Sequence, residues 1–186
     1  MPARRRSAGS ATSSSPLGSL MDVAPEQSTP VPLDDVDRQI LVLVSQDSRR
    51  SQRALARELG MSAPAVGERV ARLERLGVIR GYGVRVDWSA IGYPMAVYLT
   101  ITAAQGFQQS AIVEQIAEIP ELEALDVVTG AIDMLARLRV RDHAHLRQLL
   151  KRIWEIDGVL RTETSLSLIG VEPGNVVAEL LSKADQ

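Results

Sequence analysis

Side chains that can bind phosphates and base edges are concentrated in two short runs of the sequence, residues 49–53 and 62–72. Guanidinium groups form charge-assisted pairs with phosphate oxygens. Hydroxyl and amide groups donate to phosphates and to base edges in the grooves of a duplex. The two runs predict contact with double-stranded DNA through Arg49, Arg50, Ser51, Gln52, Arg53, Ser62, Ala63, Pro64, Ala65, Glu68, Arg69 and Arg72.

Three predicted helices must position these two runs. The first begins after Asp34, where apolar residues start to repeat at helical spacing. The second covers residues 52–59 and the third residues 63–76, and a serine stands before each as a cap. A three-residue turn containing Gly60 joins the second helix to the third. This spacing is that of a helix-turn-helix, which places its second helix in the major groove of DNA.

The third helix has the composition expected of such a recognition helix. Its opening residues, 62–65 and Glu68, are predicted to face base edges, and arginines follow on its polar side. In the alternative interpretation, the three helices are only a packing unit with a solvated basic face. Arg69 would then brace the second helix. Gly67 costs a helix about 1 kcal/mol relative to alanine, so we expect it to permit close approach to DNA or to another helix.

Charge is unevenly distributed along the 186 residues, although the net charge is only −2. Residues 34–86 contain ten arginines against seven acidic residues, whereas residues 87–186 contain eight basic and fourteen acidic residues. The first of these segments is therefore the one expected to meet phosphate. A surplus of three charges predicts weak non-specific binding per subunit, so that several subunits are needed for firm occupancy.

The second half of the chain has the pattern β-α-β-β-α-β. Alternating apolar residues predict strands over 95–101, 122–129, 134–140 and 159–169, and helical stripes lie in 112–117 and 146–153. The fold class is therefore α+β. A winged or helix-turn-helix three-helix domain precedes a ferredoxin-like βαββαβ sandwich with both helices on one face of the sheet. The other face would be bare in a monomer, so we expect another subunit to cover it.

Several runs in both halves together resemble the Lrp/AsnC, or feast/famine, transcription regulators. The resemblance covers roughly residues 33–170 and is carried by Leu33-Asp34, Asp37-Arg38-Gln39-Ile40-Leu41, Leu55-Ala56, Leu59-Gly60-Met61-Ser62, Arg69 to Ile79, Thr129 to Asp133, and Asp157 to Thr164. It implies a homodimer built through the sheet domain and assembled into tetramers or octamers. It further implies that residues 81–86 of two subunits pair, and that an amino-acid effector binds between dimers.

The resemblance places this effector near the turn between the second and third strands. The candidate contacts are Thr129, Gly130, Ala131, Ile132, Asp133, Thr162 and Thr164. Gly130 would let backbone N–H groups approach a carboxylate, and Asp133 would accept from the ammonium group. Without the resemblance, both are ordinary turn residues. Ala131, Ile132 and Met134 favour a small or apolar side chain, such as that of alanine or leucine.

The chain divides into five predicted segments. Residues 1–32 have the composition of a disordered tail, and residues 33–80 form the helix-turn-helix domain. Residues 81–94 form a linker and arm, because 78–86 alternates like a short hairpin or an extended arm. Residues 95–172 form the effector and oligomerisation domain, and residues 173–186 a C-terminal tail.

The residue types present argue against metal binding, catalysis and membrane insertion. There is no cysteine and there are only two histidines, His143 and His145, so we expect no metal site, no cofactor and no enzymatic activity. No apolar run reaches the roughly 18–20 residues of a membrane span. We expect a cytoplasmic, nucleoid-associated protein of a bacterium. Two other functions remain open: an amino-acid-binding module that regulates an enzyme, and an architectural protein that compacts DNA.

Overall fold

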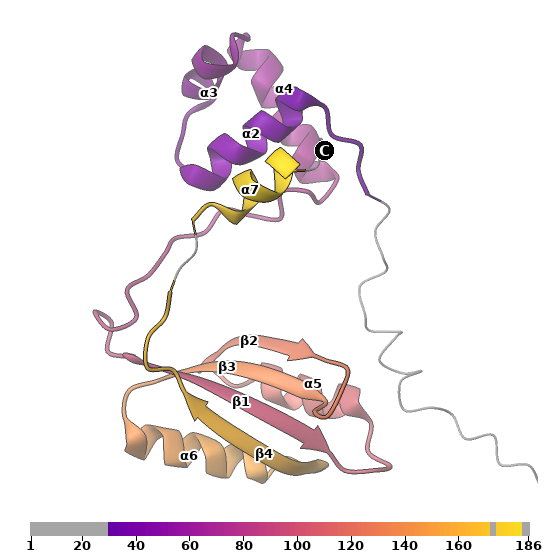
Figure 1. Cartoon of the computed structure of the whole chain (residues 1–186), viewed down its shortest axis with the longest axis vertical. Helices are drawn as coiled ribbons and strands as arrows, with labels where there is room; N and C mark the ends of the chain where they lie inside the picture. The colour runs from indigo at the N-terminus through magenta and orange to yellow at the C-terminus, as the bar shows by residue number, and fades with distance from the viewer. Residues whose placement is uncertain (1–29, 172–173, 184–186) are drawn as a thin grey trace, which may run out of the picture. The chain divides into compact units, whose positions relative to one another are not determined.

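The computed structural model describes residues 30–171 and 174–183 (Figure 1). Within these ranges the chain forms two compact units. The unit predicted to bind DNA, called the DNA-binding unit below, contains residues 30–86 together with the described residues from Ile169 onward. The unit predicted to bind an effector, called the effector unit below, contains Asp87–Leu168. Most of the predicted tail, residues 1–29, lies outside the described residues.

Three helices form the core of the DNA-binding unit: α2 (Asp35–Gln46), α3 (Gln52–Leu59) and α4 (Ala63–Arg75). Each begins where the sequence predicted, because a side-chain oxygen of the preceding Asp34, Ser51 or Ser62 accepts a backbone N–H of its first turn. Gly60 ends α3 with a φ of 64°, a conformation that glycine adopts without steric cost. One apolar face of each helix then packs into a common core of Ile40, Leu55, Ala56, Val66 and Leu73.

A further helix, α7 (Val176–Lys183), packs against α2 in the same unit. The expectation of a C-terminal tail over residues 173–186 was wrong for this segment, which is helical. Eight residues make too short a pattern to indicate a helix on their own. The helix forms because Asn175 caps it, accepting from Ala178 N–H at 3.1 Å, and because its apolar side has α2 to pack on.

The segment that follows α4 contains no strand. Residues 80–87 have no regular secondary structure, so the hairpin alternative does not form, and the segment is an arm. Val84 is 88% exposed. The Tyr82 hydroxyl donates to Glu74 Oε1 at 2.8 Å and so ties the start of the arm to the end of α4.

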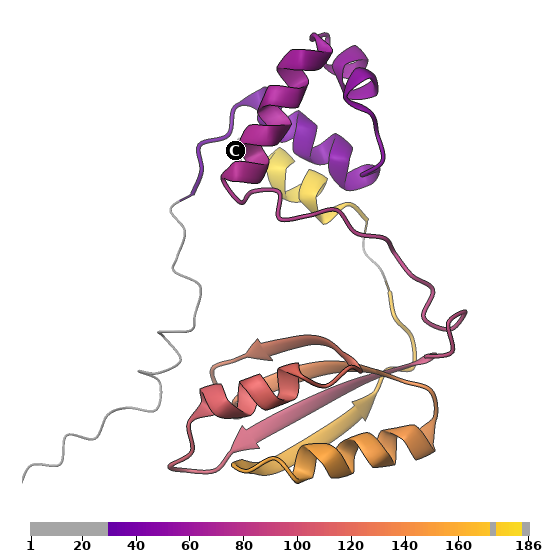
Figure 2. The same cartoon turned by 180° about the vertical axis from the view of Figure 1, so that it is seen from behind.

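The effector unit is a four-stranded antiparallel sheet with two helices on one face (Figure 2). Its strands are β1 (Met95–Ala103), β2 (Leu122–Val127), β3 (Met134–Val140) and β4 (Val159–Leu166), in the order β2-β3-β1-β4. Its helices are α5 (Gln109–Ala117) and α6 (His143–Trp154). This topology confirms the predicted ferredoxin-like fold. Strands β2 and β4 end two and three residues earlier than predicted.

Alternate residues of the two central strands form the core beneath the helices. On β3 the residues Met134, Ala136, Leu138 and Val140 are all buried. Arg137 and Arg139 therefore project from the opposite face of the sheet, where both pair with Glu123 at 2.9 and 2.7 Å. Both arginines of β3 are therefore paired with an acidic residue of the neighbouring strand β2. A partner subunit on this face remains a prediction.

A buried histidine links the start of α6 to the segment before β2. The backbone N–H of Arg141 donates to His145 Nδ1 at 3.2 Å, so Nε2 carries the proton and donates to Glu121 Oε1 at 2.9 Å. Arg152 lies 3.5 Å from the other oxygen of Glu121. Burial alone would raise the pKa of Glu121, but the hydrogen bond from His145 and the charge of Arg152 outweigh it and hold the pKa below its ordinary value.

This depressed pKa predicts an acid-sensitive effector unit. The carboxylate stabilises the fold above the pKa that it has in the unfolded chain, and this stabilisation is lost as pH falls through the lower folded value. Both tryptophans, Trp88 and Trp154, lie in this unit, so their fluorescence in urea measures its unfolding. We expect Glu121→Gln to lower stability at pH 7 and to reduce the further loss between pH 7 and 3. Glu118→Gln, at an exposed position, is the control; equal pH profiles in the two variants would contradict the prediction.

Candidate DNA interface and effector site

The first turn of α4 is capped and faces outward. The Ser62 hydroxyl accepts from Ala65 N–H at 3.3 Å, and Pro64 is tolerated there because the first N–H groups of a helix have no intrahelical partner. Ser62, Pro64 and Glu68 are exposed, whereas Ala63 and Ala65 are half-buried. Val66 and Leu73 are fully buried on the opposite side. The helix is thus anchored by one face, and its opening residues lie at the surface.

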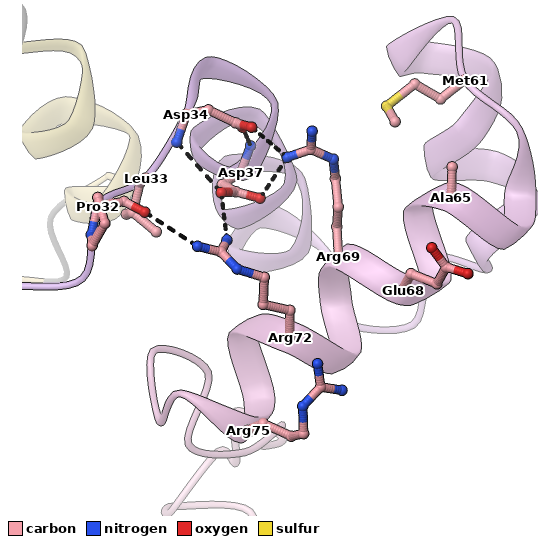
Figure 3. A pocket seen from close by; sticks show the side chains of 10 residues that line it. All are labelled: Pro32, Leu33, Asp34, Asp37, Met61, Ala65, Glu68, Arg69, Arg72 and Arg75. Atoms are coloured by element: carbon pink, nitrogen blue, oxygen red, sulfur yellow. Dashed lines mark hydrogen bonds and ion pairs between the residues drawn. The ribbon is translucent and has the colours of Figure 1, made fainter.

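Two arginines of α4 reach across to the start of α2 (Figure 3). Arg69 lies 2.6 Å from Asp34 Oδ2 and 2.9 Å from Asp37 Oδ1. Arg72 lies 2.9 Å from Asp37 Oδ2 and donates to the carbonyl of Pro32 at 3.4 Å. Asp37 is only 1% exposed, so it is a buried carboxylate compensated by two guanidinium groups.

The same two aspartates form the capping box of α2. Asp34 Oδ1 accepts from the backbone N–H of Asp37 at 2.8 Å, and the Asp37 side chain accepts from the Asp34 N–H at 3.4 Å. The hydrogen bond from the Asp37 backbone and then that from Arg69 lower the pKa of Asp34. The hydrogen bonds to Asp34 and Asp37 raise the pKa of Arg69. Electrostatics and capping therefore fix α4 relative to α2.

This network changes the interpretation of Arg69 and Arg72. The sequence suggested that Arg69 could brace the second helix, but it braces the first, α2. The side chains of Arg69 and Arg72 remain 31% and 40% exposed, and their contact with phosphate stays a prediction. The sequence contains one signal of this network: two aspartates three residues apart, matched by two arginines three residues apart.

The side chains before and at the start of α3 differ in their exposure and in the partners that they contact. The Arg49 side chain is 94% exposed and lies 3.8 Å from Asp47 Oδ1, and Arg53 is also exposed. Arg50, which precedes α3, pairs with Glu58 of that helix. The Ser51 hydroxyl accepts from Ala54 N–H at 3.2 Å as the helix cap. Arg49 and Arg53 are therefore the arginines of this run best placed for a phosphate.

The position of the Gln52 side chain depends on Gly67 of α4. A Cβ on Gly67 would lie 2.9 Å from Gln52 Oε1, so the missing side chain makes room for Gln52 against α4. The close approach expected at this glycine is therefore to another helix. It brings the amide of Gln52 beside the recognition helix.

In the effector unit, Asp133 holds the turn between β2 and β3. Its two carboxylate oxygens accept from the backbone N–H of Ala103 and from the side-chain amide of Gln109, both at 2.8 Å. Its own N–H donates to the carbonyl of Ile101 at 3.0 Å. The turn is thereby tied to the end of β1 and the start of α5, and an effector ammonium would share Asp133 with these donors.

The rest of the turn lies at the surface. Thr129, Gly130 and Ala131 are exposed and Ile132 is half-buried. Gly130 has a φ of 127°, a conformation that favours glycine. Met134 is fully buried in the core. The expectation that it lines the effector pocket was wrong, because the alternation of β3 turns its side chain toward the helices.

Sheet register brings the turn and the first of the two candidate threonines to the same end of the sheet. Ile101 of β1 is flanked by Met134 on one side and by Thr162 on the other. The Thr162 hydroxyl accepts from the indole N–H of Trp154 at 2.8 Å. Thr164 pairs with Leu99, two residues farther from this end of the sheet, and is exposed.

A helix-turn-helix unit with an outward recognition helix, joined to a ferredoxin-like α+β unit, defines a two-domain DNA-binding regulator. Residues 33–74 match the AsnC-type helix-turn-helix domain, and residues 96–176 match the Lrp/AsnC ligand binding domain. An uncharacterized HTH-type transcriptional regulator of Pyrococcus abyssi is 36% identical over 137 residues, which cover 73% of this chain and 86% of that protein. The chain belongs to the Lrp/AsnC family of transcriptional regulators and is not an enzyme.

Solved structures agree with this assignment. The leucine response regulatory protein LrpA of Mycobacterium tuberculosis is 31% identical, with a TM-score of 0.68, and the match covers 76% of this chain and 96% of that one. A regulator of Neisseria meningitidis in complex with L-Met shares the fold, with a TM-score of 0.73 at 18% identity over 76% of this chain and 94% of that one.

Two further findings apply to the described ranges, 30–171 and 174–183. No helix there combines the length and the apolar character that a membrane crossing requires. No three or more histidine or acidic side chains come together there in an arrangement that could hold a metal ion.

Proposed function

We propose that this protein binds specific DNA sequences through the first turn of α4 and responds to a small amino acid bound between dimers of its effector unit. Two properties of α4 carry the proposal. Ion pairs with Asp34 and Asp37 fix the helix in place. Its opening residues Ser62, Pro64 and Glu68 are exposed. A recognition helix needs both properties, since it must hold its position and present side chains to base edges.

A gel-shift experiment with DNA from upstream of the protein's own gene tests this proposal. We expect binding to that duplex to exceed binding to random DNA of equal length at the same salt concentration. Equal affinities would favour an architectural compacting protein. Failure to bind either DNA would leave the effector unit as a module that acts on another protein.

Dimers are proposed to form through the bare face of the sheet, and the arm at residues 81–86 to pair between subunits. Two recognition helices would then contact half-sites about one turn of DNA apart. Linking dimers into a tetramer or octamer raises the local concentration of DNA-binding units. An effector between dimers shifts this assembly only by its difference in affinity for the two states. Sedimentation with and without amino acids would reveal such a shift.

We propose alanine or leucine as the effector, bound at the turn 129–133 and near Thr162 and Thr164. The complex of the Neisseria protein with L-Met supports an amino acid in this fold. With Met134 in the core, Ala131 and Ile132 are the apolar residues left at the turn. Titration calorimetry in which only aspartate or lysine binds would overturn this choice.

Gly130→Thr is expected to abolish the heat of effector binding. Threonine is strained at a φ of 127° and would move the backbone N–H groups that approach the ligand. The matched control is Gly92→Thr, since Gly92 also has a positive φ, 88°, and lies in the linker before β1. Calorimetry should show binding lost in the first variant and kept in the second. Unchanged binding in Gly130→Thr would remove the turn from the site.

The proposed partner, DNA, places the protein in the compartment that holds the chromosome, which is the cytoplasm of a prokaryote. The relatives named above come from an archaeon and from two bacteria.

A further inference from the structure

Helix α7 lies beyond both domains that define the family. The helix-turn-helix match ends at residue 74, and the ligand-binding match ends at residue 176, where α7 begins. The helix nevertheless belongs to the DNA-binding unit and not to the effector unit from which the chain arrives. In both views of the structure it lies alongside α2 (Figures 1 and 2).

Polar contacts fix the start of α7 on α2. Asn175 Nδ2 donates to the Ser45 hydroxyl at 2.8 Å, and the Ser45 hydroxyl lies 3.1 Å from Asn175 Oδ1. The same Oδ1 caps α7 by accepting from Ala178 N–H. The Asn175 side chain therefore both caps α7 and attaches it to Ser45, which lies 130 residues earlier in the chain.

The side of α7 that faces α2 and α3 is apolar. Ala178 and Leu181, three residues apart, line a hollow with Val42 and Leu43 of α2 and Leu59 of α3. Polar side chains, among them Asp35, Arg38 and Glu58, line the rest of this hollow. Leu180 points away and is 64% exposed. An isolated helix of eight residues is not stable in water, so α7 is helical only while this side is docked. Folding of α7 and its attachment to α2 are one event.

Two segments of the chain connect the DNA-binding unit covalently to the effector unit. The chain leaves this unit after Val86 and returns to it at Ile169. The returning link, residues 167–175, joins the end of β4 to α7 and spans at most about 30 Å when extended. Thr162 and Thr164, two of the proposed effector contacts, lie on β4.

We propose that α7 is a strap. Docked on α2 and α3, it completes the DNA-binding unit and gives it a second tether, through residues 167–175, to β4, which carries two of the proposed effector contacts. The second tether limits the positions that the recognition helix can take, which raises the effective concentration of the second helix once the first has bound. Undocking α7 therefore weakens binding to DNA that carries two half-sites.

Hydrogen exchange tests the docking, and this part is independent of DNA and effector. In the full chain, Leu181→Lys removes the apolar side chain that α7 packs against Val42, Leu43 and Leu59. Leu180→Lys makes the same substitution on the exposed side of the same helix and is the control. We expect amides of α7 to exchange at least tenfold faster in Leu181→Lys than in the wild type. The amides of α2 that α7 covers should also exchange faster in this variant. Leu180→Lys should exchange at the wild-type rates. Equal rates in the two variants would overturn the docked strap.

Binding to DNA tests the second half of the proposal, which rests on the proposed function. The probe is the upstream duplex, compared with a shortened duplex that carries one half-site. We expect Leu181→Lys to weaken binding to the longer duplex about fivefold or more and to the shorter one less. Faster exchange with unchanged binding to both would make α7 a structural helix only and overturn the strap. If the wild type binds no DNA, the proposed function fails, while exchange still decides whether α7 docks.

Discussion

Asp37→Asn is expected to destabilise the DNA-binding unit by about 2 kcal/mol and to weaken DNA binding with it. Asp37 is 1% exposed and accepts from Arg69 and Arg72 at 2.9 Å each. An amide of the same shape removes the charge that compensates both guanidinium groups, and breaking a buried pair from one side leaves the partners uncompensated. The loss is smaller than for a fully buried pair, because both arginines are partly exposed.

Urea unfolding followed by circular dichroism measures this effect, and tryptophan fluorescence supplies an internal reference. Trp88 and Trp154 both lie in the effector unit, so the fluorescence transition should stay unchanged while the dichroism transition moves to lower urea. Asp35→Asn is the matched control, since Asp35 lies in the same first turn and is exposed. Equal shifts in the two variants would show that charge at the start of α2, and not the brace to α4, is what matters.

Pro64→Glu is expected to abolish most DNA binding without harming the fold. Pro64 is exposed in the first turn of α4, where a carboxylate interacts favourably with the helix dipole. Stability should therefore change by no more than about 0.5 kcal/mol. A negative charge facing DNA phosphates is expected to cost about 2–3 kcal/mol of binding, or roughly 30–150-fold in affinity.

Fluorescence anisotropy with a labelled upstream duplex measures this loss. Pro64→Gln has the same length without the charge and should lose only a few-fold. His143→Glu places the same charge at an exposed helix start in the effector unit and should change little. If Pro64→Glu binds as the wild type does, the first turn of α4 does not enter a groove, and the proposed DNA interface is wrong.

Much of the helical structure follows from neighbouring residues alone. Ser51 and Ser62 each stand three residues before the backbone N–H that they cap, so the starts of α3 and α4 are where the sequence predicted them. The strand and helix periods of the second half likewise predict the sheet and its two helices, since alternation decides which side of each strand is apolar. These features could be predicted because the interactions that produce them span only a few residues.

The candidate sites were predicted in outline but not in their contacts. The sequence placed Arg69 and Arg72 on the polar side of α4, whereas their partners, Asp34 and Asp37, stand 32 to 35 residues earlier. No local pattern joins residues so far apart. The pairing depends on the angle at which α2 and α4 cross over their shared core.

Helix caps, turn glycines and the two hydrophobic periods were thus determined by the sequence itself, because each depends on neighbours along the chain. Tertiary structure alone decided that Asp133 holds its turn through Ala103 and Gln109, that Met134 faces the core, and that Asn175 docks a last helix onto Ser45. These contacts join segments 24 to 130 residues apart. They form only when packing of the apolar faces brings those segments together.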